Sequence, residues 1–342
     1  MIIAIDAMGG DHAPAAVLDG IRMVLPELPQ QITLCLYGDE IQLREGLNAR
    51  QMSEEQIKIV PTTEIIGCEE APTLAVRKKK DSSLVRAVRA VADGEADCVL
   101  SAGSTGALLT GGTLIIKRLE GVKRPALATI LPTVQGGSTV LLDCGANTDC
   151  KPEYLVQFAL MGGAYANRVL GIQKPRIGLL NNGAEAEKGN ELTKAAYQLF
   201  QNAPFDFAGN CEARDVCSGD FDVVVCDGFD GNMILKGMEG TVSLMMTMMK
   251  KSFMSSLRTK IGAKLAMPAL RSLKKSLDYT EFGGAPLLGV RSGVIKAHGS
   301  SNGKAFRSAI LQAVKLVQTD VCGLVQNSIA SMPQESEETT RD

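Results

Sequence analysis

The chain has 342 residues, 45% of them hydrophobic, and a net charge of −2, so it can bury a large core but has no overall attraction to nucleic acid. No run of about 18 apolar residues predicts a membrane span, and Asp6 interrupts the apolar start before it resembles a signal peptide. The nine cysteines form no C-x-x-C pair, and the only histidines are His12 and His298. This pattern favours reduced thiols in a cytosolic protein and disfavours a zinc site or a histidine-activated nucleophile.

Strand-like apolar runs alternate with helical segments along the chain, which predicts an α/β fold with a mainly parallel sheet covered by helices on both faces. The predicted strands are 2–7, 32–37, 57–60, 98–101, 126–131, 139–142, 177–180, 205–208, 221–226 and 294–297. The predicted helices are 15–25, 40–47, 83–92, 105–117, 152–170, 191–201 and a long one from Asn232. We expect a single catalytic domain over residues 1–332, which includes a basic helical tip at 241–280, and a disordered acidic tail at 333–342.

The loops that follow the predicted strands are rich in glycine and small polar residues. Seven such loops occur, at 6–14, 101–106, 143–147, 181–189, 207–212, 226–232 and 296–302. In parallel α/β folds these positions bind ligands. Neither a G-x-G-x-x-G nor a G-x-x-x-x-G-K-[ST] motif appears in the required context, so nucleotide sites are disfavoured. A small anion such as phosphate suits the loops better.

The stretch 221–236 predicts a buried strand, a tight turn and the start of a helix. Gly228 and Gly231 would let backbone N–H groups face a ligand, and Asn232 and Lys236 would add donors at the helix N-terminus. An ordinary strand–turn–helix is the alternative, and the six companion loops favour the anion site. The basic segment 77–83 also has two interpretations, a solvated turn or a cationic clamp for phosphate. Asp81 or Ser82 is the predicted N-cap of the helix that follows.

The tip combines basic charge with apolar side chains. From Thr241 to Leu277 there is no acidic residue, and the basic residues are Lys250, Lys251, Arg258, Lys260, Lys264, Arg271, Lys274 and Lys275. The long helix leading to the tip carries a methionine-rich stripe, of which 245–249 is a candidate apolar groove because methionine adapts to variable shapes. Attachment to anionic lipid, docking of an acidic carrier protein and a merely solvated hairpin all fit this composition. The expected contact residues are Lys260, Ile261, Lys264, Leu265, Met267, Leu270 and Lys274.

Eight segments in chain order form one recognisable set. They are DAMGGD (6–11), RKKKDSS (77–83), SAGSTGA (101–107), LDCGAN (142–147), GLLNNG (178–183) with Lys188-Gly189, GNCEAR (209–214), CDGFDGN (226–232), and GGAPLLG (283–289) with HGSS (298–301). Together they resemble the bacterial phosphate acyltransferase family, often called PlsX, which makes acyl phosphate from acyl-acyl carrier protein. Ser104 stands where the family usually has Asn, and Asp230 where Thr is common. Because Asp230 adds negative charge near the anion site, we expect it to point to solvent.

The resemblance implies a Rossmann-like α/β/α fold related to phosphotransacetylases and isocitrate-dehydrogenase-like enzymes. It also implies a homodimer that needs no metal or organic cofactor. The resemblance further implies a cytoplasmic protein that associates peripherally with the inner face of the cell membrane. The implied reaction moves a long-chain acyl group from acyl-acyl carrier protein to inorganic phosphate. The product would feed phospholipid synthesis through a membrane glycerol-3-phosphate acyltransferase.

Phosphate dianion needs no strong base to attack a thioester, so we expect direct transfer without an acyl-enzyme. The expected catalytic residues are His298, Lys188 and Asn232, although a structural role for His298 fits equally well. The expected phosphate- and substrate-binding residues are Asp6, Gly9, Gly10, Lys80, Ser82, Ser104, Thr105, Asn147, Asn181, Asn210, Asp227, Gly228 and Lys236. Within this set, Asp6 and Asp227 are expected to orient loops and cations.

Three other functions compete with this one. A phosphotransacetylase would act on short acyl-coenzyme A and would not need the basic tip. A metal-dependent dehydrogenase would need an acidic cluster that Asp222, Asp227 and Asp230 do not form on one helical face. A non-catalytic membrane scaffold would explain the tip but not the seven polar loops.

Overall fold

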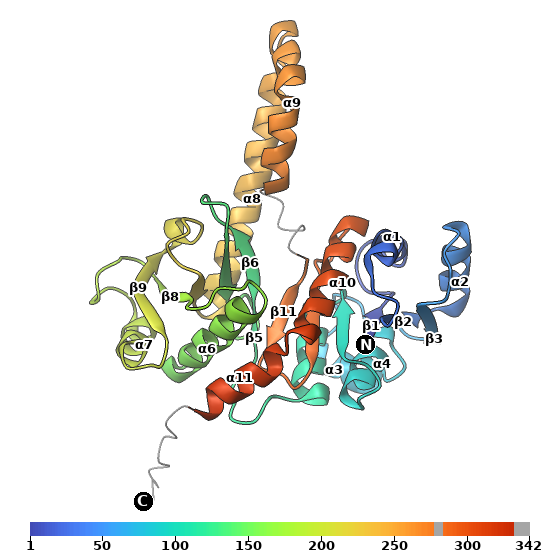
Figure 1. Cartoon of the computed structure of the whole chain (residues 1–342), viewed down its shortest axis with the longest axis horizontal. Coiled ribbons are helices and arrows are strands. Elements are labelled where there is room, and N and C mark those ends of the chain that lie inside the picture. The colour runs from blue at the N-terminus through green and yellow to red at the C-terminus, as the bar shows by residue number, and fades with distance from the viewer. Residues whose placement is uncertain (277–282, 332–342) are drawn as a thin grey trace, which may run out of the picture.

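The computed structural model describes residues 1–276 and 283–331, without the side chains of 274–276. The predicted tail at 333–342 and the end of the predicted tip, 277–280, lie outside these residues. Helices and strands alternate around two separate sheets, and a helical hairpin projects away from both (Figure 1). The predicted α/β class is therefore confirmed, but the single sheet expected from the sequence is two sheets.

The larger sheet has seven strands and is parallel except around β11. Its strands, in spatial order, are β3 (Ile57–Pro61), β2 (Thr33–Gly38), β1 (Ile2–Asp6), β4 (Cys98–Ser101), β12 (Gly293–Lys296), β11 (Ala285–Leu288) and β5 (Ala126–Leu127). Strand β11 pairs antiparallel with both β12 and β5. The two faces of β1 show why the sheet is buried on both sides: Ile3 and Ile5 pack in one hydrophobic cluster and Ala4 in another.

The smaller sheet has five strands. In order they are β6 (Thr129–Pro132), β7 (Ser138–Leu142), β10 (Val223–Val225), β8 (Arg176–Asn181) and β9 (Asp206–Glu212). Only the β6–β7 pair is antiparallel. The predicted strand 126–131 is thus divided: β5 and β6 belong to different sheets, with Ala128 between them. The predicted loop 207–212 is also corrected, because these residues continue β9 as an edge strand beside β8.

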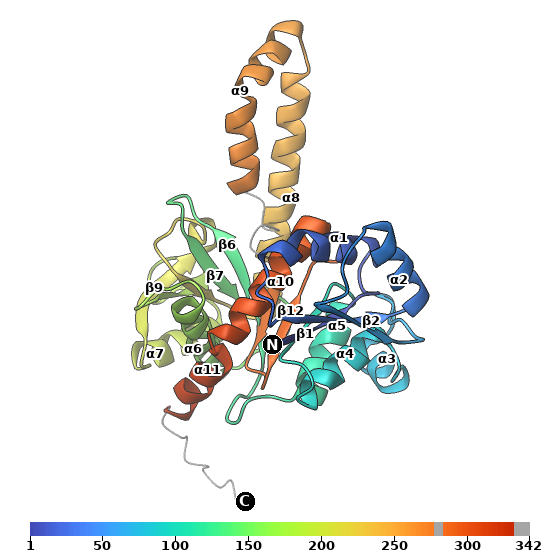
Figure 2. The same ribbon diagram turned by 45° about the vertical axis from the view of Figure 1, so that its right-hand side comes forward.

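The helices pack around the sheets as the alternation predicts (Figures 1 and 2). Their bounds are α1 (Ala15–Val24), α2 (Glu40–Ala49), α3 (Pro72–Lys78), α4 (Ser83–Ala92), α5 (Thr105–Gly111), α6 (Pro152–Arg168), α7 (Glu191–Gln201), α10 (Gly303–Gln318) and α11 (Val321–Ala330). A π-helical turn, Gly112–Ile116, extends α5, and short 3-10 turns occupy Leu25–Glu27 and Ala213–Asp215. Helices α3, α10 and α11 were not predicted.

The hairpin consists of α8 (Gly228–Phe253) and α9 (Leu257–Ser276), which lie side by side in both views (Figures 1 and 2). Helix α8 begins at Gly228, four residues before the predicted start, because the Asp227 side chain caps it by accepting from the N–H of Asp230. Helix α9 continues through Pro268 rather than ending there. Within the described ranges no single helix combines the length and apolarity of a membrane span, and only the bent pair α10–α11 passes that test jointly.

Candidate functional site

A cavity of about 210 Å³ lies where the two sheets meet; we refer to it as the central cavity. It is lined from the larger sheet by Leu127 and Lys296 and from the smaller sheet by Thr129. Four residues predicted as site residues from the sequence also line it: Thr105, Asn232, Lys236 and His298. These four come from α5, α8 and the loop after β12, so the fold does bring together loops that are far apart in the sequence.

The side chains of Lys236 and His298 contact each other at the central cavity. The Nζ atom of Lys236 lies 3.4 Å from Nε2 of His298, and it also forms a 2.8 Å ion pair with Glu239. Nδ1 of His298 lies 2.8 Å from the Ser300 hydroxyl and 3.2 Å from the Ser300 N–H, and the ring tautomer decides which of the two ring nitrogens donates. Burial and then the Lys236 charge lower the pKa of His298, which keeps the ring neutral at pH 7. A lysine ammonium and an imidazole this close together can both contact one anionic oxygen.

Lys296 is a second cation at the cavity, beside Lys236, and sequence reasoning did not select it. Its side chain is 9% exposed, and Nζ donates to the carbonyls of Ala102 and Ala297. Burial lowers its pKa to about 8, although Asp6 and Asp11 act in the opposite direction. A buried lysine in a ligand cavity is a functional candidate. Its signal in the sequence is its place at the start of the polar loop 296–302, directly after an apolar strand.

The loop after β1 packs beneath the cavity rather than lining it. Asp6 is 2% exposed and accepts from the hydroxyls of Ser83 (2.5 Å) and Ser101 (2.6 Å), which ties three loops together. Burial raises the pKa of Asp6 against these hydrogen bonds. These contacts link Asp6 to neighbouring loops of the protein, which is what the predicted orienting role requires.

Two glycines of this loop allow a close approach of neighbouring backbone. A Cβ atom on Gly9 would lie 2.7 Å from the Gly103 nitrogen, and Gly10 has a φ of +104°. The next residue donates its N–H to Gly299 O at 2.9 Å, joining this loop to the His298 loop. Ser104 caps α5 by accepting from the N–H of Ala107, so its Oγ is already used at the cavity edge.

The start of α8 is fixed by a buried acid. Asp143 accepts from the backbone N–H of Asn147 at 2.6 Å and from its side-chain amide at 2.8 Å. The carbonyl of Asn147 in turn accepts from the N–H of Gly228 at 2.7 Å. These contacts make Asp227, Gly228 and Asn147 a scaffold for Asn232, one turn further along. Asp230 is exposed in the first turn and does not line the central cavity, as expected from its charge.

Three predicted site residues lie apart from the central cavity, beside the carboxyl ends of β8 and β9. Asn181 donates from Nδ2 to the carbonyl of Lys188 (3.2 Å), and Asn210 donates to the carbonyl of Glu185 (2.8 Å). The Lys188 side chain is exposed. The Oδ1 atom of Asn210 is buried without a hydrogen-bond partner among the described residues. The structure therefore groups these three residues with each other and not with His298.

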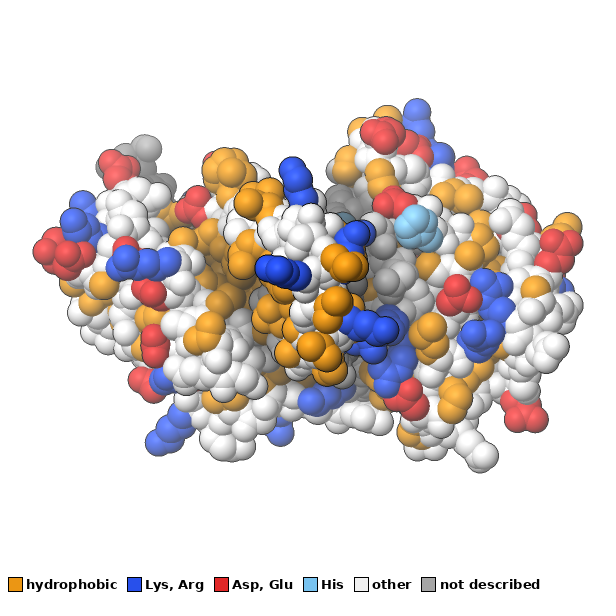
Figure 3. Space-filling model, turned by 90° about the horizontal axis from the view of Figure 1, so that it is seen from above, with side chains coloured by type: hydrophobic (Ala, Val, Ile, Leu, Met, Phe, Trp, Pro, Cys, Tyr) orange, Lys and Arg blue, Asp and Glu red, His pale blue; other side chains and the backbone are white. Residues whose placement is uncertain are grey.

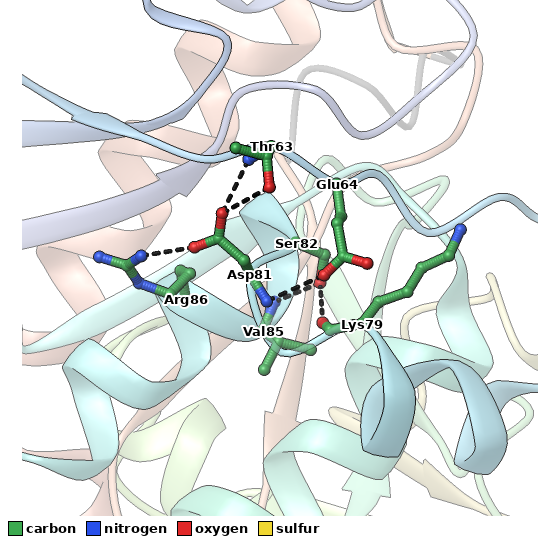
Figure 4. A network of polar contacts seen from close by, with 7 residues as sticks. All are labelled: Thr63, Glu64, Lys79, Asp81, Ser82, Val85 and Arg86. Carbon is green, nitrogen blue, oxygen red and sulfur yellow. Dashed lines mark hydrogen bonds and ion pairs between the residues drawn. The ribbon is translucent and has the colours of Figure 1, made fainter.

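The basic turn between α3 and α4 is held by its own network (Figure 4). Ser82 is fully buried; its hydroxyl donates to the Lys79 carbonyl and accepts from the N–H of Val85, which makes it the cap of α4. Asp81 accepts from Thr63 and pairs with Arg86 at 2.6 Å. Of the two predicted phosphate contacts here, Ser82 is thus used inside the fold, whereas Lys80 is exposed.

The hairpin presents hydrophobic and basic side chains side by side (Figure 3). Leu265 is 80% exposed and Leu257 76% exposed, on the same helix as the exposed Lys260 and Lys264. Ile261 and Met267 are exposed as well, and Leu270 is half-buried; the Lys274 side chain lies outside the described atoms. In the predicted groove, Met245 and Met248 are exposed while Met249 is partly buried.

Metal ligands are not assembled in the described part of the chain: no three His, Cys, Asp or Glu side chains are placed to hold an ion.

Comparison with known proteins decides the family. Residues 1–324 match the family described as "Fatty acid synthesis protein". A "Phosphate acyltransferase" of Lysinibacillus sphaericus is 50% identical over 329 residues, covering 96% of this chain and 98% of the relative. Another "Phosphate acyltransferase", of Clostridium perfringens, is 48% identical over 330 residues, covering 96% and 97%. This chain belongs to the phosphate acyltransferase family.

Solved structures with the same fold are more distant in sequence. A branched-chain phosphotransacylase from Enterococcus faecalis aligns with a TM-score of 0.59 at 17% identity, covering 93% of this chain and 99% of that one. A phosphotransacetylase from Streptococcus pyogenes aligns with a TM-score of 0.58 at 16% identity, covering 97% and 94%. These likenesses confirm the expected relation of the fold to phosphotransacetylases.

Proposed function

We propose that this chain is a phosphate acyltransferase that moves a long-chain acyl group from acyl-acyl carrier protein to inorganic phosphate. The observation that carries the proposal is the convergence of Lys236, Lys296 and the neutral His298 on one cavity between the sheets. Three basic side chains beside a single carboxylate, Glu239, favour a small anion. Family membership and about 50% identity to phosphate acyltransferases support the same reaction class.

The proposed chemistry needs positioning more than base catalysis. An oxygen of HPO₄²⁻ attacks the thioester carbonyl carbon, the carbon–sulfur bond breaks, and the phosphate proton ends on the thiol, so charge and protons balance. Lys236 and Lys296 hold the attacking dianion. The Nε2–H of His298 donates to the carbonyl oxygen as negative charge develops there. Asn232, in the second turn of α8, adds an amide donor, and Thr105 adds a hydroxyl.

The other sequence-predicted residues have proposed roles that follow from their places. Asp6, Asp227, Gly9, Gly10 and Gly228 keep the loops in position. Lys188, Asn181 and Asn210 supply substrate contacts from the smaller sheet, and the exposed Lys80 supplies positive charge at the turn between α3 and α4. We retain the single catalytic domain, the tip and the acidic tail as the proposed organisation of the chain.

The proposed setting is the cytoplasmic face of the membrane. The exposed apolar and basic residues of α9 support peripheral contact with anionic lipid. The same basic residues would also bind the acidic carrier protein. A homodimer and delivery of acyl phosphate to a membrane glycerol-3-phosphate acyltransferase complete the proposal.

One assay tests the function. Palmitoyl-carrier protein should release free thiol only when phosphate is present, whereas acetyl-coenzyme A and NAD controls should show no turnover. Preferential use of acetyl-coenzyme A would favour a phosphotransacetylase instead. Trapping of a labelled acyl group on the denatured protein would exclude direct transfer.

A further inference from the structure

A second cavity, of about 270 Å³, lies beside the central cavity, against α5 and β11. The same elements line both. On α5, Thr105 lines the central cavity and Leu109, one turn later, lines the second. On β11, Ala285 lines the first and Leu287 the second, two residues apart on one face. The two cavities therefore lie next to each other along α5 and β11, and we refer to the two together as the channel.

The walls of the second cavity mix hydroxyl and apolar groups. Thr73, Thr110 and Thr113 contribute the hydroxyls, and Leu109 and Leu287 the apolar surface. Asn147 fixes one side by donating from Nδ2 to the Pro125 carbonyl at 2.7 Å. Amide groups can form hydrogen bonds with these hydroxyls, whereas an alkyl chain cannot. An amide-bearing chain would satisfy them while its methylenes contact the leucines.

A cation marks the outer end of the channel. Arg124 lines the second cavity and is exposed. Its guanidinium carbon lies 5.9 Å from the ring centroid of Tyr154 on α6, which orients it. No salt bridge joins Arg124 to a carboxylate within residues 1–276 and 283–331. A guanidinium that lacks a carboxylate partner is suited to a phosphate group.

We propose that the second cavity binds the 4′-phosphopantetheine arm of the acyl donor, with the thioester in the central cavity and the terminal phosphate on Arg124. The inference rests on the proposed function. From Thr105 to Thr113 the channel follows eight residues of helix, about 12 Å at 1.5 Å per residue. A span of this size accommodates the two amides of the arm. The same arm occurs in carrier proteins and in coenzyme A, so the site recognises the arm and not its bearer.

The test compares Arg124→Ala, Arg124→Lys and a control, Arg168→Ala, which removes an exposed arginine of α6. Each variant is assayed with three palmitoyl thioesters: carrier protein, 4′-phosphopantetheine, and pantetheine without phosphate. Loss of one charged hydrogen bond should raise KM of Arg124→Ala for the two phosphate-bearing donors about 10- to 100-fold. KM for palmitoyl-pantetheine and for inorganic phosphate should not change. Arg124→Lys should recover part of the loss, and palmitoyl-coenzyme A should behave like the other phosphate-bearing donors.

A second variant tests the channel itself. Thr113→Trp should fill the second cavity and raise KM for palmitoyl-pantetheine more than for the short N-acetylcysteamine thioester. Equal effects of Arg124→Ala on all donors, or effects that vary with acyl-chain length, would overturn the assignment. If the wild-type protein turns over none of these donors, the proposed function fails. The subsite is then judged by calorimetry, which should detect 4′-phosphopantetheine binding to the wild type but not to Arg124→Ala.

Discussion

The Nζ atom of Lys236, on α8, lies 3.4 Å from Nε2 of His298, in the loop after β12. The two residues are 62 positions apart, and the helical hairpin separates them in the sequence. The Lys236 ammonium donates, and Nε2 of the neutral ring accepts from it or donates to a ligand according to the tautomer. Lys236 and His298 are therefore close enough to bind the same anionic oxygen in the central cavity.

Removing either donor should lower the rate. We expect His298→Ala to reduce kcat about 10²- to 10³-fold, because the developing oxyanion loses one donor. Lys236→Gln should mainly raise KM for phosphate, since it removes a charge that binds the anion in the ground state. Steady-state kinetics with palmitoyl-carrier protein measure both effects, with Lys58→Gln on the edge strand β3 as the control. Undiminished turnover by His298→Ala would exclude the proposed role.

Activity should depend on pH through Lys296. Its pKa of about 8 means that it carries a charge below pH 8 and loses it above. We therefore expect kcat/KM for phosphate to fall about tenfold per pH unit above pH 8. The Lys296→Met variant should be slower at pH 7 and lack this limb. Stability should change with pH in the opposite direction. The pKa of Lys296 is about 8 in the folded protein and lies below the ordinary value of 10.5, so the charged side chain destabilises the fold fully below pH 8. This destabilisation decreases as the pH rises from about 8 to 10.5.

Substitution of Ser82 distinguishes a structural role, capping of α4, from direct binding of phosphate. Its hydroxyl caps α4 and is fully buried, so Ser82→Ala should lower the free energy of unfolding by about 1 kcal/mol. KM for phosphate should remain unchanged, and Ser82→Thr should preserve the cap. Denaturant titration and phosphate kinetics on the same preparations check this. A selective rise in phosphate KM without loss of stability would instead restore the direct contact suggested by the sequence.

Two glycines in α8 should respond oppositely to alanine. A Cβ atom on Gly231 would lie 2.0 Å from the Asp143 carbonyl oxygen and 2.8 Å from Cys226 Sγ, so Gly231→Ala must displace the start of α8. We expect a loss of several kcal/mol or an insoluble protein. Gly240, in the same helix, has nothing within 4 Å, and Gly240→Ala should gain up to about 1 kcal/mol. Thermal unfolding of both variants measures the difference.

The hairpin should mediate membrane contact. Lys260→Glu with Lys264→Glu, or Leu265→Asp alone, should reduce flotation with vesicles containing phosphatidylglycerol, since the charge and the exposed apolar surface both contribute. A double reversal at Lys58 and Lys194, far from the hairpin in sequence, serves as the control. Flotation and carrier KM that are both unaffected by the hairpin variants would remove both proposed roles of the tip.

The sequence predicts the fold best where burial leaves a clear pattern. β1 and β10 are apolar on both faces and were readily found. By contrast, β11 contains Pro286 and follows two glycines, so its sequence is typical of a turn; only antiparallel pairing with β12 and β5 makes it a strand. The division between β5 and β6 could not be predicted, because sheet membership depends on partners distant in the sequence.

The site shows the same limit. Glycine-rich loops after strands identified His298, Asn232, Thr105 and Lys236 as candidates, but they could not tell to which sheet end each loop belongs. Lys188 was therefore placed with His298 on sequence grounds, whereas the structure groups it with Asn181. Lys296 was overlooked because its burial follows from the packing of the loop after β4, not from its neighbours in the chain.

The division of one extended segment into β5 and β6 has a mechanical consequence. Leu127 belongs to one sheet, Thr129 and Ile130 to the other, and all three line the central cavity. A molecule held there touches both halves of the protein at once, while Ala128 alone joins them at that point. Occupancy therefore adds binding free energy to the association of the two sheets. Bound substrate therefore stabilises the association of the two sheets. Without substrate, the two sheets are freer to move apart.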